Sequence, residues 1–342
     1  MDKQEKFMLR AIELAEKGRG SVSPNPMVGC VIVHEEQIIG EGYHEVYGGP
    51  HAEPNAINSV IHPALLRQAT AFVSLEPCAH WGKTPPCANL LVEKGLKKVV
   101  IGAVDSNPLV GGKGIQILKH AGIEVETGLL EKKVRDQNIR FFTYMEKKRP
   151  YIILKWAQTK DGFIARENYD SKWISNPYSR QLVHKWRSEE DAIMVGTLTA
   201  QYDNPKLNVR EWYGKNPVRV VIDRNLKLNP GLFLFDKSQT TLCYNQIHSL
   251  VEQNLEKVKL SEDFELEEIF EDLYHRQIQS IIVEGGAQIL NKLIEMELWD
   301  EARVFTGNQN FIKGIPAPIL KGSLISESNV MGDKISIWKP YH

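Results

Sequence analysis

The sequence predicts an α/β protein of two domains, and three observations support this. Its 342 residues correspond to about two domains of ~150 residues each. Its composition, 42% hydrophobic and 25% charged, is that of globular domains that bury their own cores. Helix-like and strand-like hydrophobic patterns alternate through both halves of the chain, which is typical of helices covering a sheet.

The first half opens with an amphipathic helix and continues as alternating strands and helices. Phe7, Met8, Ile12 and Ala15 share one face of this helix, which ends near Gly18. The elements expected after it are a hairpin of strands at 29–33 and 37–43, a helix from about 51, a strand at 71–75, a helix from about 87, a strand at 98–104, a helix at 114–120 and a strand at 123–126. This order predicts helices packed on a mixed sheet.

A domain boundary is predicted at the charged stretch EKKRP, residues 146–150. Residues 131–148 look helical at their start, and Pro150 closes the stretch. We therefore expect a first domain at 1–146 and a second at 150–342. The second half is expected to contain a strand at 151–157, a turn at 161–162, a helix at 177–188 and strands at 191–195, 218–222, 240–244 and 280–283, with helices between them.

Charge and hydropathy exclude several classes of protein. The chain has 42 Lys and Arg against 43 Asp and Glu, and this net charge of −1 argues against nucleic acid held by bulk charge. No apolar run approaches the ~20 residues that span a bilayer, and the charged N-terminal stretch lacks the apolar core of a signal peptide. Four cysteines are too few for a dense disulfide framework, so we expect a protein of the reducing cytoplasm.

The residues that carry chemistry in the first half are the triplet His51-Ala52-Glu53 and two cysteines, Cys78 and Cys87. One histidine and two cysteines suit Zn²⁺, and three protein ligands leave a position for water. Zinc lowers the pKa of such a water towards ~7. Glu53 is placed to take the water's proton and pass it to a leaving amine, and the pattern is the H-x-E…P-C signature of zinc deaminases.

Two alternatives stand beside this interpretation. Each residue by itself is explained as well by packing, because a histidine at a helix start can be a surface residue and single cysteines are small buried side chains. A closed structural zinc site is the stronger rival, since His80 offers a fourth ligand. His80 follows Cys78 by only two positions, whereas structural sites usually have two to four residues between paired ligands, so we favour an open site.

The spacing of the two cysteines differs from the C-x-x-C of nucleic-acid deaminases, because eight residues lie between Cys78 and Cys87. This insert contains a lysine and a threonine that suit a substrate phosphate. In these features the sequence closely resembles the bifunctional deaminase/reductases of riboflavin biosynthesis. The matching segments are SPNPMVG (23–29), GYH (42–44), HAE (51–53), EPCAHWGKTPPC (76–87) and DSNP (105–108). The family more often has proline where this chain has Ser106.

The resemblance implies a first domain with the cytidine-deaminase-like fold, a mixed sheet with helices on both faces. It implies removal of an amine from 2,5-diamino-6-ribosylamino-4(3H)-pyrimidinone 5′-phosphate, with Glu53 as the catalytic residue. The substrate contacts that it implies are Asn25, His44, His80, Lys83, Thr84, Asp105 and Asn107. Residue type alone favours ordinary turn, strand-end and loop roles for these residues.

In the second half the residues alone give a weaker signal. Glu284-Gly285-Gly286 follows a strand and precedes a helix, and its amides suit either a cofactor phosphate or a glycine turn needed for packing. The resemblance continues through LKWA (154–157), DG (161–162), SKWI (171–174), VG (195–196), DNP (203–205) and EGG (284–286), with Arg187, Thr199, Leu207 and Arg210. It implies a dihydrofolate-reductase-like α/β domain that uses NADPH.

This resemblance also implies which residues of the second half bind cofactor and substrate. Nicotinamide-cofactor contacts are implied at Ala157, Trp173, Thr199, Asp203, Gly285 and Gly286, and substrate contacts at Ser171, Arg187, Leu207, Arg210 and Glu284. Arg224 is either a partner of the 2′-phosphate of NADPH, by analogy with other NADP sites, or a surface turn residue. Residues 158–160 depart from the family's usual pattern.

The chemistry implied for the second half is hydride transfer to C1′ of the ring-opened ribosyl group. The product would be 5-amino-6-ribitylaminouracil 5′-phosphate, and we assign no proton donor from the sequence. Three hypotheses for the whole chain therefore stand: this two-step enzyme, a deaminase whose second half only binds, and a zinc-stabilised binding protein in which His80 completes the metal shell. We expect a small-molecule substrate, neither nucleic acid nor membrane as a partner, and, from the resemblance, a homo-oligomer.

Overall fold

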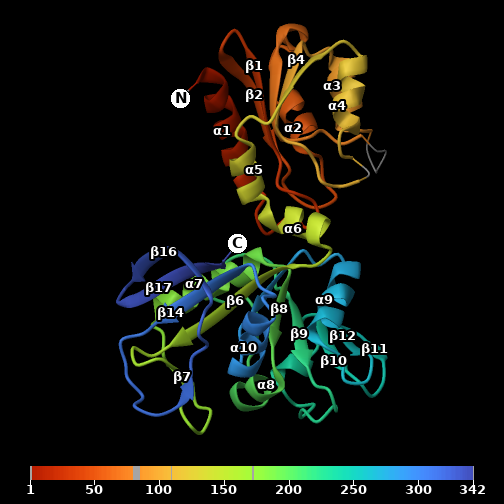
Figure 1. Ribbon diagram of the computed structural model, residues 1–342. Helices are drawn as coiled ribbons and strands as arrows, with labels where there is room; N and C mark the ends of the chain where they lie inside the picture. Colours follow the sequence, from red (N-terminus) through yellow and green to blue (C-terminus); the bar gives the residue numbers. More distant parts are fainter. Residues whose placement is uncertain (1, 80–84, 109, 172, 342) are drawn as a thin grey trace. The chain divides into compact units, whose positions relative to one another are not determined.

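The computed structural model of the chain describes residues 2–79, 85–108, 110–171 and 173–341 (Figure 1). It divides into two compact units, residues 1–148 and residues 149–342. Each unit has its own sheet and its own hydrophobic core, and each is described by itself.

The first unit is built on a five-stranded mixed sheet with the order β2-β1-β3-β4-β5. The strand β1 pairs antiparallel with both β2 and β3, while β3, β4 and β5 run parallel to one another. The bounds are β1 (Gly29–His34), β2 (Gln37–Tyr43), β3 (Thr70–Leu75), β4 (Lys98–Ala103) and β5 (Glu124–Thr127). The predicted strands of this half are therefore confirmed to within about a residue.

Helices cover both faces of this sheet, as the fold class requires. They are α1 (Lys3–Glu16), α2 (Ala52–Asn58), α3 (Cys87–Lys94), α4 (Lys113–His120), α5 (Glu131–Gln137) and α6 (Ile139–Lys147), with a 3₁₀ helix at Pro63–Gln68. On one face Met8 and Ala11 of α1 pack against Val31 and Phe72. The residues between them in the strands, such as Ile32, point to the other face, where α2, α3 and α4 complete a second core.

The chain from 131 to 148 is interrupted by Asn138, which divides α5 from α6. The buried Asn138 side chain donates to the carbonyl of Met27 at 2.9 Å and accepts the N–H of Met27 at 2.8 Å. This pair of hydrogen bonds satisfies the backbone of a distant segment that has no strand partner there. A contact of this kind carries no periodic signal, so the sequence pattern does not reveal the break.

The second unit is built on a ten-stranded mixed sheet with the order β11-β12-β10-β9-β8-β13-β6-β14-β17-β16. The strands from β12 to β14 in this order run parallel, and β11, β17 and β16 are antiparallel to their neighbours. The bounds are β6 (Tyr151–Gln158), β8 (Ala192–Val195), β9 (Val218–Ile222), β10 (Thr241–Asn245), β11 (Leu250–Glu252), β12 (Leu255–Lys259), β13 (Ser280–Val283), β14 (Glu301–Thr306), β16 (Gly322–Val330) and β17 (Asp333–Pro340). A separate small sheet pairs β7 (Phe163–Ala165) with β15 (Ile315–Pro316).

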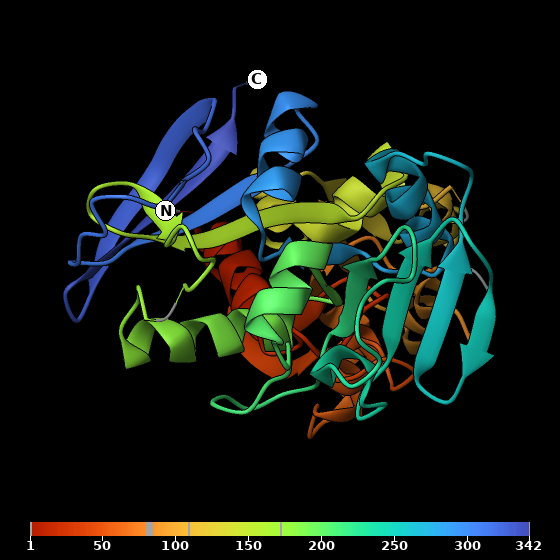
Figure 2. The same ribbon diagram turned by 90° about the horizontal axis from the view of Figure 1, so that it is seen from below.

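Helices lie on both faces of the ten-stranded sheet (Figure 2). They are α7 (Pro177–Glu189), α8 (Thr197–Asp203), α9 (Leu266–His275) and α10 (Ala287–Glu295), with a short 3₁₀ helix at Phe233–Phe235. The main core joins Phe270 of α9 and Leu290 of α10 to the strand residues Leu154 and Val283. On the other face Val183 of α7 packs against Phe305.

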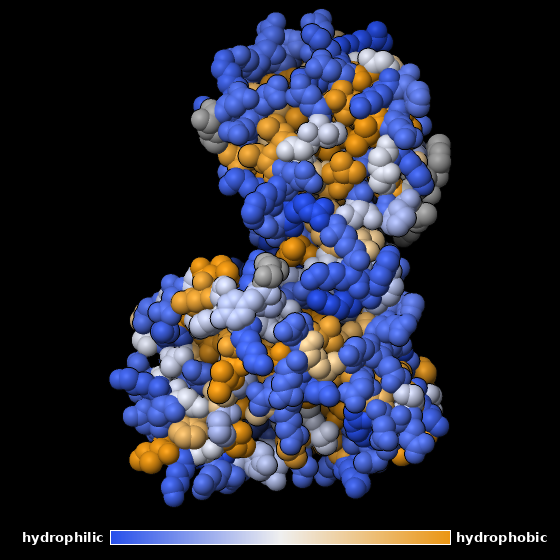
Figure 3. All heavy atoms as spheres, in the orientation of Figure 1, coloured by the Kyte–Doolittle hydropathy of each residue, from blue (hydrophilic) through white to orange (hydrophobic). Residues whose placement is uncertain are grey.

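The surface of the protein carries both polar and apolar side chains. Polar residues cover most of the visible face, with apolar side chains between them (Figure 3). Among the helices of the described residues, none is long and apolar enough to cross a membrane.

Candidate functional site

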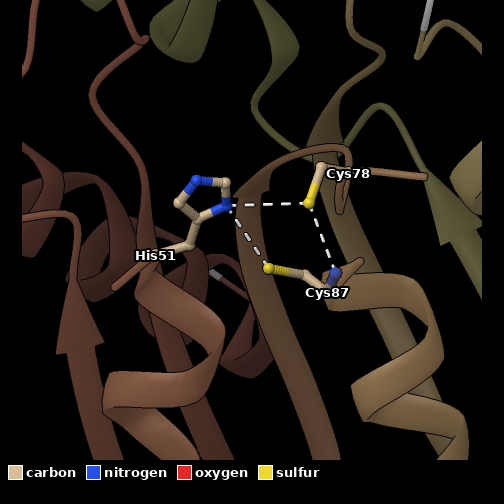
Figure 4. A group of neighbouring side chains, drawn as sticks. All are labelled: His51, Cys78 and Cys87. Carbon is tan, nitrogen blue, oxygen red and sulfur yellow. Dashed lines mark hydrogen bonds between the residues drawn. The ribbon is translucent and has the colours of Figure 1, made fainter. Parts of the chain in front are cut away.

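The candidate metal ligands of the first unit come from three places in the fold. His51 is the residue before α2, Cys78 lies in the loop after β3, and Cys87 is the first residue of α3. The Nδ1 atom of His51 lies 3.6 Å from the Sγ of Cys78 and 3.4 Å from the Sγ of Cys87, and the three side chains point toward one another (Figure 4). All three candidate ligand atoms lie within 4.8 Å of one another.

This geometry fits a tetrahedral zinc ion. Zinc binds cysteine sulfur at ~2.3 Å and histidine nitrogen at ~2.0–2.1 Å, so two ligand atoms of a tetrahedral site lie roughly 3.5–3.8 Å apart. The backbone N–H of Cys87 also donates to the Sγ of Cys78 at 3.3 Å, which stabilises a thiolate at that position. His51, Cys78 and Cys87 are therefore able to hold zinc with three protein ligands among the described residues.

The thiols of Cys78 and Cys87 share a proton. Hydrogen bonds from Cys87 and His51 lower the pKa of Cys78 well below its ordinary value, against the opposing effect of burial. The same shared proton, together with burial, raises the pKa of Cys87 above its ordinary value. One thiolate is thus favoured even without an ion, and zinc favours the second.

Glu53 lies in the first turn of α2, two residues after His51, with its side chain buried. Burial raises the pKa of the Glu53 carboxyl to about 7, and the negative charge of Cys78 adds to this, while His51 opposes it. A carboxyl in this position can both accept and release a proton near neutral pH. The sequence pattern H-x-E therefore corresponds to a buried acid–base group beside the candidate zinc ligands.

Asn25 and His44 lie together next to the ligand His51. The Nδ2 of Asn25 and the Nε2 of His44 are 3.1 Å apart, and the His44 ring meets the His51 ring edge-on with centroids 5.1 Å apart. The Nδ1 of His44 donates to the carbonyl of Pro50 at 2.9 Å, and burial lowers the pKa of His44. These contacts describe a neutral His44 that accepts from Asn25 through Nε2.

Asp105 and Asn107 follow β4 on a loop near Cys78. The N–H of Asn107 donates to Oδ1 of Asp105 at 2.7 Å. Burial raises the pKa of Asp105 to about 6, the Asn107 hydrogen bond opposes this, and the negative charges of Glu76 and Cys78 add to it. The other predicted substrate residues, His80, Lys83 and Thr84, lie outside the described residues.

The second unit has a cavity of about 1180 Å³ at the carboxyl ends of its parallel strands. Lys155 and Ala157 of β6, Val195 of β8, Ile222 of β9 and Glu284 after β13 reach it. Ligands of open α/β sheets bind in this location. The structure brings to this cavity every residue predicted to bind cofactor or reductase substrate: Ala157, Ser171, Trp173, Arg187, Thr199, Asp203, Leu207, Arg210, Arg224, Glu284, Gly285 and Gly286.

A bidentate ion pair in the cavity joins two residues that were predicted as separate substrate contacts. Arg187 donates from Nε to Oε1 of Glu284 at 2.8 Å and from Nη2 to Oε2 at 2.7 Å. Burial works to raise the pKa of Glu284, but the charges of Arg187 and Lys155 outweigh it and lower the pKa to about 2. Glu284 is therefore a fixed anion, and Arg187 orients it.

Lys155 is a charged residue of this cavity to which the sequence analysis gave no role. Its Nζ lies 3.7 Å from Oε2 of Glu284, and burial lowers its pKa, with Arg187 acting in the same direction and Glu284 opposing. The sequence signal was present, because a single lysine interrupts the apolar run of a buried strand.

Arg224, which follows β9 in the wall of the cavity, already makes contacts within the protein. Its Nη2 donates to the carbonyl of Phe264 at 2.5 Å, and its guanidinium lies 4.2 Å from the centroid of the Phe264 ring. Asp223 is turned inward, where its two oxygens accept the N–H groups of Lys227 and Leu228 at 2.9 Å each. The Lys227 side chain lies in the same wall of the cavity and is exposed.

Two family models match the chain, one in each half. Residues 1–103 match the cytidine and deoxycytidylate deaminase zinc-binding region, and residues 150–308 match the RibD C-terminal domain. The riboflavin biosynthesis protein RibD of Actinobacillus pleuropneumoniae is 40% identical, over 96% of this chain and 87% of that protein. The RibD of Aquifex aeolicus is 38% identical, over 94% of this chain and 92% of that protein.

Solved structures agree with the sequence relatives. A diaminohydroxyphosphoribosylaminopyrimidine deaminase/5-amino-6-(5-phosphoribosylamino)uracil reductase from Thermotoga maritima matches with a TM-score of 0.90 and 38% identity, covering 99% of each chain. RibD of Acinetobacter baumannii matches with a TM-score of 0.90 and 34% identity, again over 99% of each chain. These matches confirm the expected fold class, the zinc and NADPH cofactors and the joining of a deaminase to a reductase. The chain belongs to the RibD family, the bifunctional deaminase/reductases of riboflavin biosynthesis.

Proposed function

We propose that the first unit deaminates 2,5-diamino-6-ribosylamino-4(3H)-pyrimidinone 5′-phosphate and that the second reduces the product with NADPH to 5-amino-6-ribitylaminouracil 5′-phosphate. The observation that carries this proposal is the convergence of His51, Cys78 and Cys87 beside the buried carboxyl of Glu53. The names of the structurally similar deaminase/reductase and of the curated relatives support the choice of substrate class.

In the deaminase step, His51, Cys78 and Cys87 would hold zinc, and the bound ion would supply Lewis-acid activation of water. Glu53 takes a proton from the attacking water and returns it to the amine that leaves the pyrimidine ring as ammonia. Asn25 and His44, hydrogen-bonded to each other next to the ligands, orient the base. Asp105 and Asn107 also contact this substrate. The contacts implied by the family resemblance at His80, Lys83 and Thr84 belong to the same substrate.

In the reductase step, the cavity of the second unit would hold NADPH, which would supply the hydride for C1′ of the ring-opened sugar. Gly285 and Gly286, with Thr199 beside them, provide backbone amides and a hydroxyl for the cofactor phosphates. The cofactor contacts are completed by Ala157, Trp173, Asp203 and Arg224. Arg187 holds Glu284 toward the substrate side of the cavity, together with Ser171, Leu207 and Arg210.

The wall of the cavity that follows β9, residues 223–227, is suited to NADPH rather than NADH. In many NAD sites an acidic residue accepts the ribose 2′-hydroxyl. Both oxygens of Asp223, at the corresponding strand end, already accept backbone N–H groups. Arg224 and Lys227 supply positive charge there, which a 2′-phosphate would satisfy.

We also propose that the chain acts as a homo-oligomer in the cytoplasm, with its domains divided at 146–150. Zinc ligation by Cys78 and Cys87 requires reduced thiols, in agreement with that compartment. In the second unit, Leu324 and Ile325 of β16 and nearby Met331 leave apolar side chains exposed along the outer strand of the sheet, where a second copy could pack. Light scattering at the 38.9 kDa of a single chain would contradict the oligomer.

We expect Glu53→Gln to lower the rate of ammonia release by roughly 10²–10⁴-fold, because the amide cannot carry the proton from water to the amine. Zinc content measured by atomic emission should stay at about one ion per chain, since Glu53 is not among the ligands. NADPH oxidation with the deaminated substrate should be unchanged. The exposed Glu35→Gln serves as the control.

Cys87→Ser gives the contrasting result, because it removes a ligand rather than the proton carrier. It should lose both zinc and ammonia release. Full deamination by Glu53→Gln would refute the proton-transfer role, and full zinc content in Cys87→Ser would refute the three-ligand site.

Breaking the buried Arg187–Glu284 ion pair should destabilise the second unit strongly. Arg187→Met leaves Glu284 with Lys155 as its remaining cationic neighbour in the cavity, and loss of one partner of a buried pair costs about 3–5 kcal/mol of unfolding free energy. Lys334→Met breaks an exposed pair with Glu327 and should cost about 1 kcal/mol or less. Chemical denaturation of each variant measures both values.

The sign of the pH dependence follows from the lowered pKa of Glu284. The stabilisation is fully present above the unfolded glutamate value of ~4.3 and is lost as the pH falls toward about 2. The Arg187→Met/Glu284→Gln double variant should recover part of the lost stability. Additive losses in the double variant would contradict a direct pair.

The preference for NADPH over NADH tests the role of Arg224 and Lys227 in the cavity wall. Arg224→Ala and Lys227→Ala should each weaken NADP⁺ binding by roughly 10-fold or more relative to NAD⁺, because a charge-assisted contact to the 2′-phosphate is lost. Quenching of tryptophan fluorescence measures the binding, since Trp156 and Trp173 line the cavity. Lys237→Ala, whose lysine pairs with Glu252 outside the cavity lining, is the control. An unchanged ratio in Arg224→Ala would remove Arg224 from the 2′-phosphate site.

A further inference from the structure

Glu76 is a buried acid that the proposed chemistry leaves without a role. It follows the last residue of β3 and lies two residues before the candidate ligand Cys78, and its side chain is only 4% exposed. A buried carboxylate is costly unless hydrogen bonds satisfy it. The contacts of Glu76 therefore indicate what it stabilises.

Four backbone N–H groups donate to this one carboxylate. Gly114 and Ile115 donate to Oε1 at 3.0 and 3.3 Å, and Gly112 and Asp105 donate to Oε2 at 3.0 and 3.3 Å. Three of the four donors belong to the start of α4, whose preceding residue, Gly112, has no side chain to cap the helix. The Glu76 carboxylate thus caps α4 from another segment and also binds the N–H of Asp105, near the start of the loop that leads to this helix.

Backbone packing fixes the same junction. A Cβ atom at Gly114 would lie 2.1 Å from the carbonyl oxygen of Pro77, so the helix start touches the chain between Glu76 and Cys78. The N–H of Glu76 donates to the carbonyl of Ala103 at 3.0 Å, which places the ends of β3 and β4 side by side. The loop from Asp105 to α4 is therefore held at both ends against residues 76 and 77.

We propose that Glu76 is a positioning residue for the deaminase step. Its carboxylate fixes the loop that carries Asp105 and Asn107 to the segment that carries Cys78, and so sets where the substrate lies relative to the metal centre. This inference rests on the proposed function, because it assumes that Asp105 and Asn107 contact the substrate. Small displacements of substrate-positioning groups change catalytic efficiency greatly, which gives the anchor its effect.

The test is Glu76→Gln in the full-length chain. The amide keeps the size of the side chain and one acceptor oxygen, but its NH₂ group faces two of the N–H donors. We expect KM for the diaminopyrimidine ribosyl phosphate to rise roughly tenfold or more, with kcat changed much less. Zinc content should stay at about one ion per chain, and the amides of residues 112, 114 and 115 should exchange their hydrogens faster. Glu76→Asp, which keeps the charge, should restore KM in part.

Several controls separate this role from a merely structural one. Glu93→Gln, on the exposed face of α3, should leave KM and amide exchange unchanged. NADPH oxidation by the second unit of the same molecule reports whether the sample is intact. A purely structural role would lower the melting temperature of Glu76→Gln and leave KM at its wild-type value, and that outcome would overturn the inference.

The remaining outcomes are equally decisive. Slow exchange of the three amides in Glu76→Gln would show that the carboxylate is not their anchor. If Glu76→Gln does not fold, hydrogen exchange of the unmodified protein is measured instead. The inference then requires that the amides of residues 112, 114 and 115 are protected as one group. Failure of the wild-type chain to release ammonia would refute the proposed function itself, whereas an active wild type with an unchanged KM in Glu76→Gln refutes the inference about Glu76 alone.

Discussion

The candidate metal site of the first unit depends on two helices, α2 and α3, that begin at the same edge of one sheet. His51 precedes α2 and Cys87 begins α3, while Cys78 is supplied by the loop that leaves β3 between them. Helix N-termini carry partial positive charge, and that charge favours the thiolates that a zinc site needs. The metal ligands are therefore fixed by backbone geometry that the packing of α2 and α3 on the sheet already determines. Glu76 extends the same arrangement, since its carboxylate accepts the N–H of Gly114 at the start of α4, which touches the backbone of Pro77.

In the second unit, the main electrostatic feature of the cavity is a buried carboxylate held between two cations. Its cavity lies at the carboxyl ends of parallel strands, and the buried Glu284 there is neutralised by Arg187 from α7 and Lys155 from β6. Because the cations come from separate elements, the anion is satisfied only when the helix and the strands are docked correctly. Such a network orients its members rigidly, which a hydride-transfer site needs in order to align cofactor and sugar.

Sequence reasoning predicted the strands of the first sheet and five of the ten strands of the second, but it missed features that depend on tertiary context. Strand β16 has almost no buried residues, so it carries no alternating pattern, and its place at the sheet edge is set by pairing with β17. The break at Asn138 depends on hydrogen bonds to Met27, which is 111 residues away. Likewise Arg187 and Glu284 each looked like an independent substrate contact, because nothing in either local sequence reveals that they bind each other across 97 residues. What sequence can supply is residue type and local spacing, and both were sufficient to identify His51, Cys78 and Cys87 as a possible zinc-binding group.

The two buried glutamates show why position alone does not assign a chemical role. Glu53 and Glu284 are both removed from water, yet the pKa of Glu53 is raised to about 7 and that of Glu284 is lowered to about 2. The difference comes from their neighbours, since Glu53 faces the negative charge of Cys78 while Glu284 faces two cations. A carboxyl that titrates near neutrality can move a proton in each turnover, and one that stays ionised can only orient or attract. A zinc ion would lower the pKa of Glu53 and leave it ready to accept the proton of water, so the metal and the burial act in opposite directions on the same group. The environments of these two residues therefore give one buried carboxyl a pKa suited to proton transfer and keep the other ionised.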